Sequence, residues 1–354
     1  MNVGIQMIFQ NFDGQWSDEE VVAAEMRTAE SAEPLGYDAI WPVEHHFTDY
    51  AACPDNTQFL TWAAAKTSRL KLATGAFILP WNNPLRVAEK IALLDQMSGG
   101  RAVLGFGRGL ARREYAGMGI DMGESRDRFD EAAAMILEAL DTGFIEGDGP
   151  YYPQARTEIR PRPLRGFRDR LYSVGMSPES VQQAAKLGAH LMVFSQVPWD
   201  KFAEGTLAAF NTTFRDTHHR EPPPVLTVDL MYCDEDAGRA EEVARKHMAA
   251  YYLSVLEHYE IMNDHFKKMK GYEMYAGASD IMRQLDVTEI ARSYVDVQCW
   301  GTPQQIVERL QERRKLLGSF ELSAIVNYGG LPFADAERSM RLFGEQVLPE
   351  LHGW

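Results

Sequence analysis

Short apolar runs rich in β-branched residues alternate along the chain with longer amphipathic runs. This alternation is typical of βα units arranged around a parallel sheet. The short runs predict eight strands, at Val3–Phe9, Asp38–Trp41, Leu70–Thr74, Ala102–Phe106, Leu171–Val174, His190–Phe194, Val225–Met231 and Leu322–Asn327. The longer runs predict helices at Asp18–Ala32, Thr57–Thr67, Leu85–Met97, Arg126–Asp141, Pro178–Leu187, Lys201–Phe214, Ala237–Tyr259, Pro303–Leu317 and Asp335–Leu351.

Helix-start signals support several of these helices. Ser17 with Glu20 fits a capping box, as does Thr302 with Gln305. Eight strands with intervening helices predict a (β/α)8 TIM barrel, formed as one domain by residues 1–354. A doubly wound open sheet is the alternative, because a linear pattern does not show whether a sheet closes.

Two segments do not fit the regular βα unit. Gly143–Arg170 is rich in Gly, Pro, Tyr and Arg, and it predicts a long extended connection. Residues 261–300 follow the helix after the seventh strand and include FKKMKGYEMYAGAS. Because insertions of this length after a barrel strand often form lids or binding loops, we expect a lid-like insertion there. Three aromatic residues in it supply either substrate contacts or ordinary packing: Phe266, Tyr272 and Tyr275.

Composition narrows the range of partners. The formal net charge of −15 repels phosphate backbones, so neither nucleic acid nor an anionic membrane surface is an expected partner. Three cysteines without a CxxC pair favour a reducing compartment over a disulfide framework or structural zinc. The start MNVGIQMIFQ lacks a basic n-region, and no apolar run approaches the roughly 20 residues of a membrane span. We therefore expect a cytoplasmic protein.

Unusual residue groups follow six of the predicted strands. In barrels of this kind, chemistry collects at the C-terminal ends of the strands, which share one rim. We therefore expect the active site at this rim. The six groups are Glu44-His45-His46, Gly75-Ala76, Gly105-Phe106-Gly107-Arg108-Gly109, Gly175-Met176-Ser177, Ser195-Gln196 and Asn327-Tyr328-Gly329-Gly330.

The neighbours His45 and His46 raise the question of a metal site. Adjacent residues in extended backbone point to opposite faces, so these two histidines should not ligate one ion. The rest of the sequence supplies no evident third ligand, and we expect no metal. His46 is expected to pack and hydrogen-bond at the strand end. His45 is the candidate for acid/base work, because histidine titrates near neutrality.

Arginine and serine side chains predict an anion site at the same rim. The glycines of GFGRGL run G-x-G-x-G, which is not the dinucleotide fingerprint, but they let a flat or anionic ligand approach the backbone beside Arg108. Ser177 and Ser180 open a helix whose free N–H groups and dipole favour an anion, with plain capping as the alternative. Ser177 and Ser180, together with Arg108 and Arg126, predict a phosphate-binding site, since guanidinium groups bind phosphate bidentately.

The chain resembles the bacterial luciferase-like flavin-dependent monooxygenases from Met1 to about Leu351. The resemblance rests on AIWPVEHHFT, LKLATGAFILPWNNPLRVAEKIALLDQMSGGRAVLGFGRGL, MGIDMGESR and NYGGLPFADAERSMRLFGEQVLP. It implies a (β/α)8 barrel that binds reduced FMN supplied by a separate flavin reductase. It also implies that a C4a-peroxyflavin formed with O2 transfers one oxygen atom to a small organic substrate. A homodimer is a further expectation from the family.

The resemblance also assigns roles to single residues. Gly75-Ala76 matches a non-prolyl cis peptide that lies against the flavin ring, and Glu44 matches a residue in the flavin environment. His45 matches the histidine usually given acid/base duty near the reactive edge of the flavin. The matches to contacts with the FMN phosphate are Arg108, Arg126, the backbone of Met176, Ser177 and Ser180.

The chain departs from the luciferase pattern at three of these places. Gly107 stands where luciferases carry a reactive cysteine, which puts the lifetime of a peroxyflavin in doubt. Met176 replaces an acidic residue, and Gln196 replaces a tryptophan beside the flavin ring. Light emission is therefore not implied.

Two other functions fit the same resemblance. The first is a deazaflavin (F420)-dependent oxidoreductase that transfers hydride without oxygen, because one fold serves both chemistries. The second is a non-catalytic flavin-binding partner subunit, against which the retained His45, Arg108 and Arg126 argue.

Overall fold

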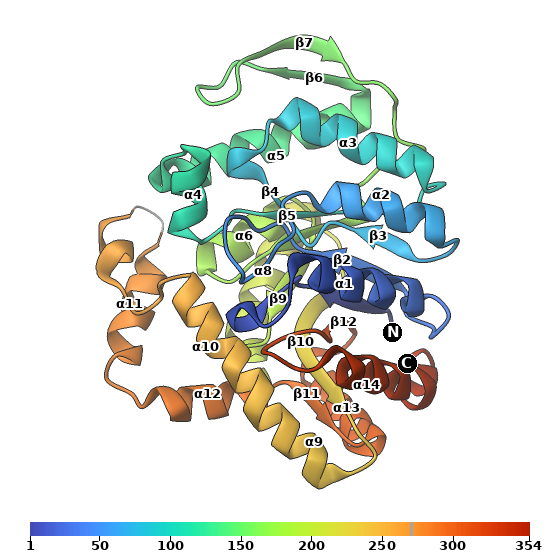
Figure 1. Cartoon of the computed structure of the whole chain (residues 1–354). Helices are drawn as coiled ribbons and strands as arrows, with labels where there is room; N and C mark the ends of the chain where they lie inside the picture. The colour runs from blue at the N-terminus through green and yellow to red at the C-terminus, as the bar shows by residue number, and fades with distance from the viewer. Residues whose placement is uncertain (270–271) are drawn as a thin grey trace.

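A closed barrel of eight parallel strands forms the centre of the molecule (Figure 1). The computed structural model describes residues 1–269 and 272–354. Each strand pairs with the next, and the last returns to the first, with Val3 aligned to Leu322. The predicted barrel is thus confirmed, and the open sheet was the wrong alternative. The ring runs β1 (Val3–Met7), β2 (Ala39–Pro42), β3 (Lys71–Ala73), β5 (Ala102–Gly107), β8 (Leu171–Val174), β9 (His190–Phe194), β10 (Val225–Cys233) and β12 (Phe320–Ile325).

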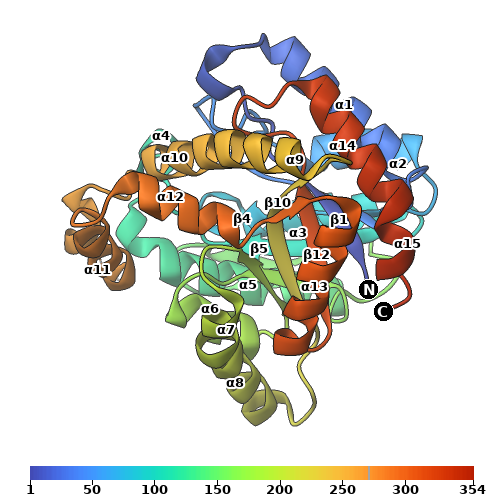
Figure 2. The ribbon, with the colours of Figure 1, turned by 90° about the horizontal axis from the view of Figure 1, so that it is seen from below.

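Helices that connect successive strands surround the ring, as Figures 1 and 2 show from two directions. The capping boxes at Ser17 and Thr302 are both formed, because each hydroxyl accepts a hydrogen bond from the backbone three residues later and the residue there reciprocates. The surrounding helices include α1 (Asp18–Ala32), α2 (Asn56–Lys66), α3 (Pro84–Met97), α5 (Ser125–Thr142), α6 (Pro178–Lys186), α7 (Trp199–Phe202), α8 (Ala208–His218), α13 (Pro303–Leu317), α14 (Phe333–Gln346) and α15 (Leu348–Leu351).

The segment Gly143–Arg170 is not simply an extended connection. It folds back on itself as an antiparallel hairpin of β6 (Phe144–Gly147) and β7 (Gln154–Glu158), which lies outside the barrel in Figure 1. Backbone groups that leave the barrel need partners, and the returning strand supplies them locally. At the end of the segment Arg170 pairs with the buried Asp95 at 2.5 Å.

The region after β10 is more regular than the sequence predicts. The helix predicted at Ala237–Tyr259 forms as α9 (Ala237–Val243) and α10 (Ala249–His258), joined by a π-helical turn at Ala244–Met248. Residues 261–300 contribute α11 (Glu273–Met282), α12 (Val287–Asp296) and the short strand β11 (Cys299–Gly301), which pairs with β10. Residues 270 and 271 of this predicted insertion lie outside the described residues. Helices α10, α11 and α12 lie together on one side of the barrel (Figures 1 and 2).

Two further elements near the barrel rim were missed from the sequence. Strand β4 (Phe77–Ile78) adds to β5 after the Gly75-Ala76 turn, with Phe77 aligned to Phe106. Helix α4 (Arg112–Met118) follows β5 directly. Both are short, so neither leaves a clear periodic pattern in the sequence.

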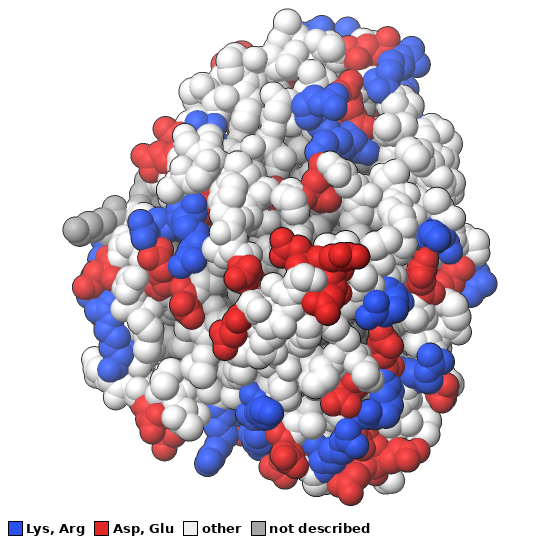
Figure 3. All heavy atoms as spheres, viewed as in Figure 1, with Lys and Arg blue, Asp and Glu red and all other residues white. Residues whose placement is uncertain are grey.

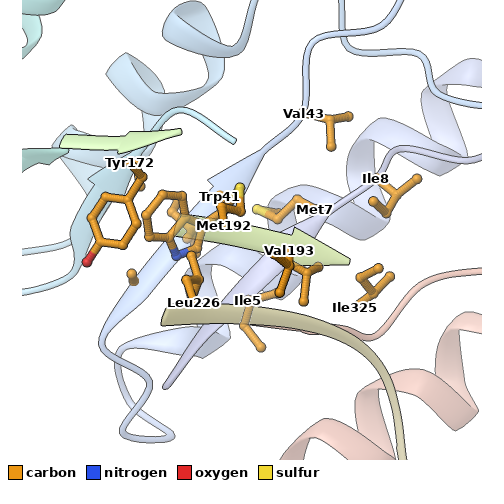
Figure 4. Close-up of a cluster of buried hydrophobic side chains, with 14 of the residues drawn as sticks. Ile5, Met7, Ile8, Trp41, Val43, Tyr172, Met192, Val193, Leu226 and Ile325 are labelled. Atoms are coloured by element: carbon orange, nitrogen blue, oxygen red, sulfur yellow. The ribbon is translucent and has the colours of Figure 1, made fainter. Parts of the chain in front are cut away.

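Apolar side chains from several strands fill the barrel (Figure 4). The rings of Trp41 and Tyr172 meet edge to face with their centroids 4.8 Å apart. Because β2 and β8 are separated by β3 and β5 in the ring, this contact crosses the interior. The buried residues labelled in Figure 4 are Ile5, Met7, Ile8, Trp41, Val43, Tyr172, Met192, Val193, Leu226 and Ile325.

The face drawn in Figure 3 carries acidic and basic side chains side by side, with acidic side chains gathered near its centre. The two ends of the chain meet, since the amino group of Met1 donates a hydrogen bond to the carbonyl of Leu351 at 3.0 Å. Among the described residues, no helix has the length and apolar composition that crossing a membrane requires.

Glu25 on α1 is expected to make the stability of the fold depend on pH. It is 2% exposed, and one carboxylate oxygen accepts the Phe9 N–H at 3.0 Å. Burial raises its pKa from 4.5 to about 7, against the opposing hydrogen bond from Phe9. Because the folded state then holds this proton more tightly than the unfolded state, the free energy of unfolding should fall as pH rises from 4.5 to 7. The contribution is up to about 3 kcal/mol, at about 1.4 kcal/mol per pH unit.

Denaturant unfolding of Glu25→Gln at several pH values checks this expectation. The variant has no ionisable group at this position, so its stability should fall less over this pH range than that of the wild type. Glu19→Gln, at an exposed position of the same helix, is the control and should follow the wild type. Equal pH dependence in the Glu25 variant and the wild type would contradict the assignment.

Candidate active site

A cavity of about 260 Å³ opens at the C-terminal ends of the barrel strands. One wall consists of strand-end residues and the other of residues from α10, α11 and α12. The cavity therefore lies at the rim at which the sequence predicts the active site. Seven of the predicted site residues line it: Glu44, His45, Gly75, Ala76, Arg108, Met176 and Ser180.

His45 is held by a buried carboxylate that the sequence did not reveal. Its Nδ1 lies 2.9 Å from Oε1 of Glu114, a residue of α4 that is 1% exposed. The same oxygen accepts the backbone N–H of His46 at 2.7 Å. A carboxylate only accepts hydrogen bonds, so Nδ1 of His45 carries a proton and Nε2 is left for chemistry. Nε2 lies 3.3 Å from the hydroxyl of Tyr259, which also lines the cavity.

Glu44 is tied into the structure around the cavity. Its oxygens accept hydrogen bonds from the Trp81 indole at 2.7 Å, the Asn82 amide at 2.8 Å and the Ile78 backbone at 3.0 Å. It therefore joins the end of β2 to the turn after β4. His46 is 9% exposed and lies 3.4 Å from the same carboxylate, so it packs and hydrogen-bonds as the sequence predicts.

His258 completes a cluster with His45 and Glu114. Its ring stacks on Tyr50 at 4.1 Å and stands edge-on to His45 at 5.3 Å. Burial, with a smaller contribution from His45, lowers its pKa to about 2, so the ring is neutral. Among the described residues, its Nε2 has no hydrogen-bond partner.

These three residues correct one premise of the sequence argument against a metal. A third ligand exists after all, because potential ligand atoms of His45, Glu114 and His258 lie within 4.8 Å of one another. A cation bound at Nδ1 of His45 would have to break the 2.9 Å hydrogen bond to Glu114. We therefore interpret the cluster as an acid/base group.

The guanidinium group of Arg126 lies near Arg108 and is incompletely hydrogen-bonded. Its Nη2 is buried without a hydrogen-bond partner among the described residues. Burial, followed by the charge of Arg108, lowers the pKa of Arg126. Burial raises the pKa of the cavity-lining Tyr275, and the charges of Arg108 and Arg126 oppose this rise. Arg108 also lies over the Tyr272 ring at 4.2 Å. Two neighbouring cations, one of them incompletely hydrogen-bonded, fit an anionic group.

The helix start at Ser177 forms the predicted cap. The Ser177 hydroxyl accepts the Ser180 N–H at 3.3 Å. In return, the Ser180 hydroxyl accepts the N–H groups of Met176 at 3.0 Å and Ser177 at 2.9 Å. An anion at this helix start would take over the N–H groups that the Ser180 hydroxyl now accepts. Ser177 is 2% exposed and, like Arg126, is not part of the cavity wall.

Two glycines bring the backbone close to the cavity. The Gly75-Ala76 peptide bond is cis, in agreement with the family pattern. A side chain at Gly75 would meet Gln6 and Trp41 at 2.9 Å. At Gly107 a Cβ would lie 2.7 Å from Cδ1 of Ile78, so the cysteine found in luciferases does not fit here unless Ile78 moves.

Other residues that the sequence singled out after the strands make contacts that stabilise the fold. The Ser195 hydroxyl donates to buried Asp229 at 2.8 Å. In the segment 327–330, the backbone of Gly329 contacts Gln10 and His247, and no residue of this segment lines the cavity. Phe266 and Tyr272 are buried as ordinary packing, whereas Tyr275 reaches the cavity.

The family model of the luciferase-like monooxygenases matches residues 1–319. The chain belongs to this family. The alkanal monooxygenase alpha chain of Photorhabdus luminescens is 26% identical over 357 residues, which cover 95% of this chain and 94% of that protein.

Solved structures agree with this membership of the luciferase-like family. Monooxygenase RslO1 from Streptomyces bottropensis matches with a TM-score of 0.78 and 26% identity, over 99% of this chain and 100% of RslO1. Two structures below 25% identity show the shared fold. The FMN complex of the oxygenating constituent of 3,6-diketocamphane monooxygenase from Pseudomonas putida has a TM-score of 0.77 at 18% identity, covering 99% and 98%. The F420-dependent tetrahydromethanopterin reductase of Methanopyrus kandleri matches with a TM-score of 0.69 at 22% identity, and the match covers 99% of each chain.

Proposed function

We propose that this luciferase-like protein is a monooxygenase that uses reduced FMN and O2 to oxygenate a small organic substrate. The observation that carries the proposal is the buried Nη2 of Arg126 without a hydrogen-bond partner, next to Arg108. A phosphate monoester carries about −1.5 to −2 charges at neutral pH, which suits two adjacent guanidinium groups.

Each residue then has one task around the cofactor. Arg108 and Arg126 bind the phosphate, assisted by Ser177, Ser180 and the backbone of Met176. The cis peptide at Gly75-Ala76 supports the flat ring, and Glu44 fixes the wall beside it. Reduced FMN supplies the electrons with which O2 is activated.

In this proposal, His45 is the residue that transfers protons. Glu114 fixes the ring so that Nε2 lies at the cavity wall, where it exchanges a proton with the bound reactants. We further propose a separate flavin reductase as the source of reduced FMN, and a homodimer as the working form.

Anaerobic titration followed by rapid mixing with O2 tests the proposal. The protein should bind reduced FMN more tightly than reduced F420, and the bound flavin should be reoxidised with kinetics and absorbance spectra that differ from those of free reduced FMN. Preference for reduced F420, with hydride transfer and no O2 consumption, would replace the proposal by the deazaflavin function. Binding of flavin with oxidation identical to free flavin would instead favour a non-catalytic partner subunit.

A further inference from the structure

Tyrosine rings dominate the part of the cavity that lies away from the strand ends. They come from the segment after β2 and from the region of α10, α11 and α12. Two methionines, Met274 and Met282, lie on the same wall and supply adaptable thioether contacts to flat rings. The tyrosines that line the cavity are Tyr50, Tyr251, Tyr252, Tyr259, Tyr275 and Tyr294.

Three of these hydroxyl groups already have partners. The hydroxyls of Tyr50 and Tyr251 lie 3.1 Å apart and hydrogen-bond to each other. The hydroxyl of Tyr259 lies 3.3 Å from Nε2 of His45. These contacts fix the wall next to the acid/base group.

The hydroxyl groups of Tyr252, Tyr275 and Tyr294 make no hydrogen bond to the side chains and backbone of the described residues, and none of them is sealed off from the cavity. Tyr252 is 7% and Tyr294 is 8% exposed, and both residues line the cavity. Burial raises the pKa of Tyr252 and of Tyr275 to about 12, and that of Tyr294 well above its usual range. All three therefore remain protonated donors at neutral pH.

The positions of two of these donors are fixed by packing. The Tyr252 ring on α10 stacks on the Tyr294 ring on α12, with centroids 4.2 Å apart and an angle of 18° between the planes. A hydroxyl that opens on an apolar cavity favours a ligand that gives it a hydrogen-bond partner. A bound molecule with suitably placed oxygen atoms would provide one.

We propose that this tyrosine wall, made of Tyr252 and Tyr294, selects an aromatic substrate that carries carbonyl or hydroxyl oxygens. This inference rests on the proposed function for the identity of the bound molecule as substrate. Ring edges and faces of the wall contact the aromatic system, and the free hydroxyls donate to its oxygens. An unsubstituted alkyl chain leaves these donors unpaired, and a site of this kind discriminates strongly against such a ligand.

Equilibrium binding to the full-length, flavin-free protein tests the proposal without requiring turnover. Three probes separate the contributions: 1-acetyl-2-naphthol has a ring and oxygens, 1-ethylnaphthalene has the ring alone, and decanal has a chain with one oxygen. We expect 1-acetyl-2-naphthol to bind at least tenfold more tightly than either of the others. Tightest binding of decanal, or equal binding of the two naphthalenes, would overturn the proposal.

Variants that lose only a hydroxyl give the second measurement. Tyr252→Phe and Tyr294→Phe should each weaken 1-acetyl-2-naphthol roughly threefold to tenfold, while 1-ethylnaphthalene is unaffected. Tyr37→Phe, whose hydroxyl donates to the Met340 carbonyl away from the cavity, is the control. Unchanged affinity in the Tyr252→Phe/Tyr294→Phe double variant would overturn the role of the wall.

The two proposals fail in different ways. If the protein neither binds nor oxidises reduced FMN but discriminates among the three probes, the tyrosine wall stands as an aromatic-binding site and the monooxygenase proposal falls. If flavin oxidation proceeds but no probe is preferred, the monooxygenase proposal stands and the substrate class is wrong.

Discussion

Replacing His45 with alanine is expected to lower turnover with reduced FMN and O2 by roughly 10²–10⁴-fold, the range for losing a general acid/base. Affinity for reduced FMN should stay nearly unchanged, because the phosphate contacts are made by other residues. The expectation rests on the place of His45 in the cavity wall and on the 2.9 Å hydrogen bond from its Nδ1 to Glu114. Steady-state turnover and anaerobic flavin titration measure the two quantities separately.

Glu114→Gln tests whether the carboxylate positions His45. The amide can donate as well as accept, so it no longer fixes the proton on Nδ1, and turnover should fall toward that of His45→Ala with flavin affinity retained. Glu242→Gln, at an exposed position of α9, is the matched control and should behave as the wild type. A collapse of reduced FMN binding in His45→Ala would show that His45 holds the flavin and does not act as the acid/base.

Replacing Arg126 with alanine is expected to weaken reduced FMN binding by roughly 10- to 150-fold, the equivalent of about 1.5–3 kcal/mol for a hydrogen bond to a charged group. Its Nη2 is buried, and no described residue accepts a hydrogen bond from it, so binding a phosphate would satisfy a group that is otherwise desolvated without a partner. Anaerobic fluorescence or calorimetric titration gives the dissociation constants.

Arg128 provides a control on the same helix. Its guanidinium group already pairs with Glu124 at 2.9 Å and lies over the Tyr151 ring, so Arg128→Ala should leave flavin affinity unchanged. Equal losses of flavin affinity in Arg126→Ala and Arg128→Ala would point to a general effect of surface charge. The phosphate-binding site would then have to lie elsewhere. Riboflavin, which lacks the phosphate, should bind the wild type and Arg126→Ala equally.

Local sequence patterns specified most of the framework. Each of the eight ring strands appears where an apolar run predicts it, and the capping boxes at Ser17 and Thr302 form from residues three positions apart. These features depend on neighbours in sequence, so they can be read without the fold. The position of the site also followed, since the C-terminal ends of parallel strands share one rim. The hairpin of β6 and β7 and the short helix α4 left weaker patterns and were missed.

The sequence by itself therefore determined the eight strands, the end of the sheet at which the site lies and the candidate residues His45, Arg108 and Arg126, together with the family motifs. Only the tertiary structure decided that the sheet closes into a barrel and which groups surround the candidate residues. Glu114 reaches His45 from a helix 69 residues further along the chain. His258 and the tyrosine wall come from α10 and α12. Hydrogen bonds and burial depend on distances in space, and a linear pattern carries no information on contacts between segments so far apart.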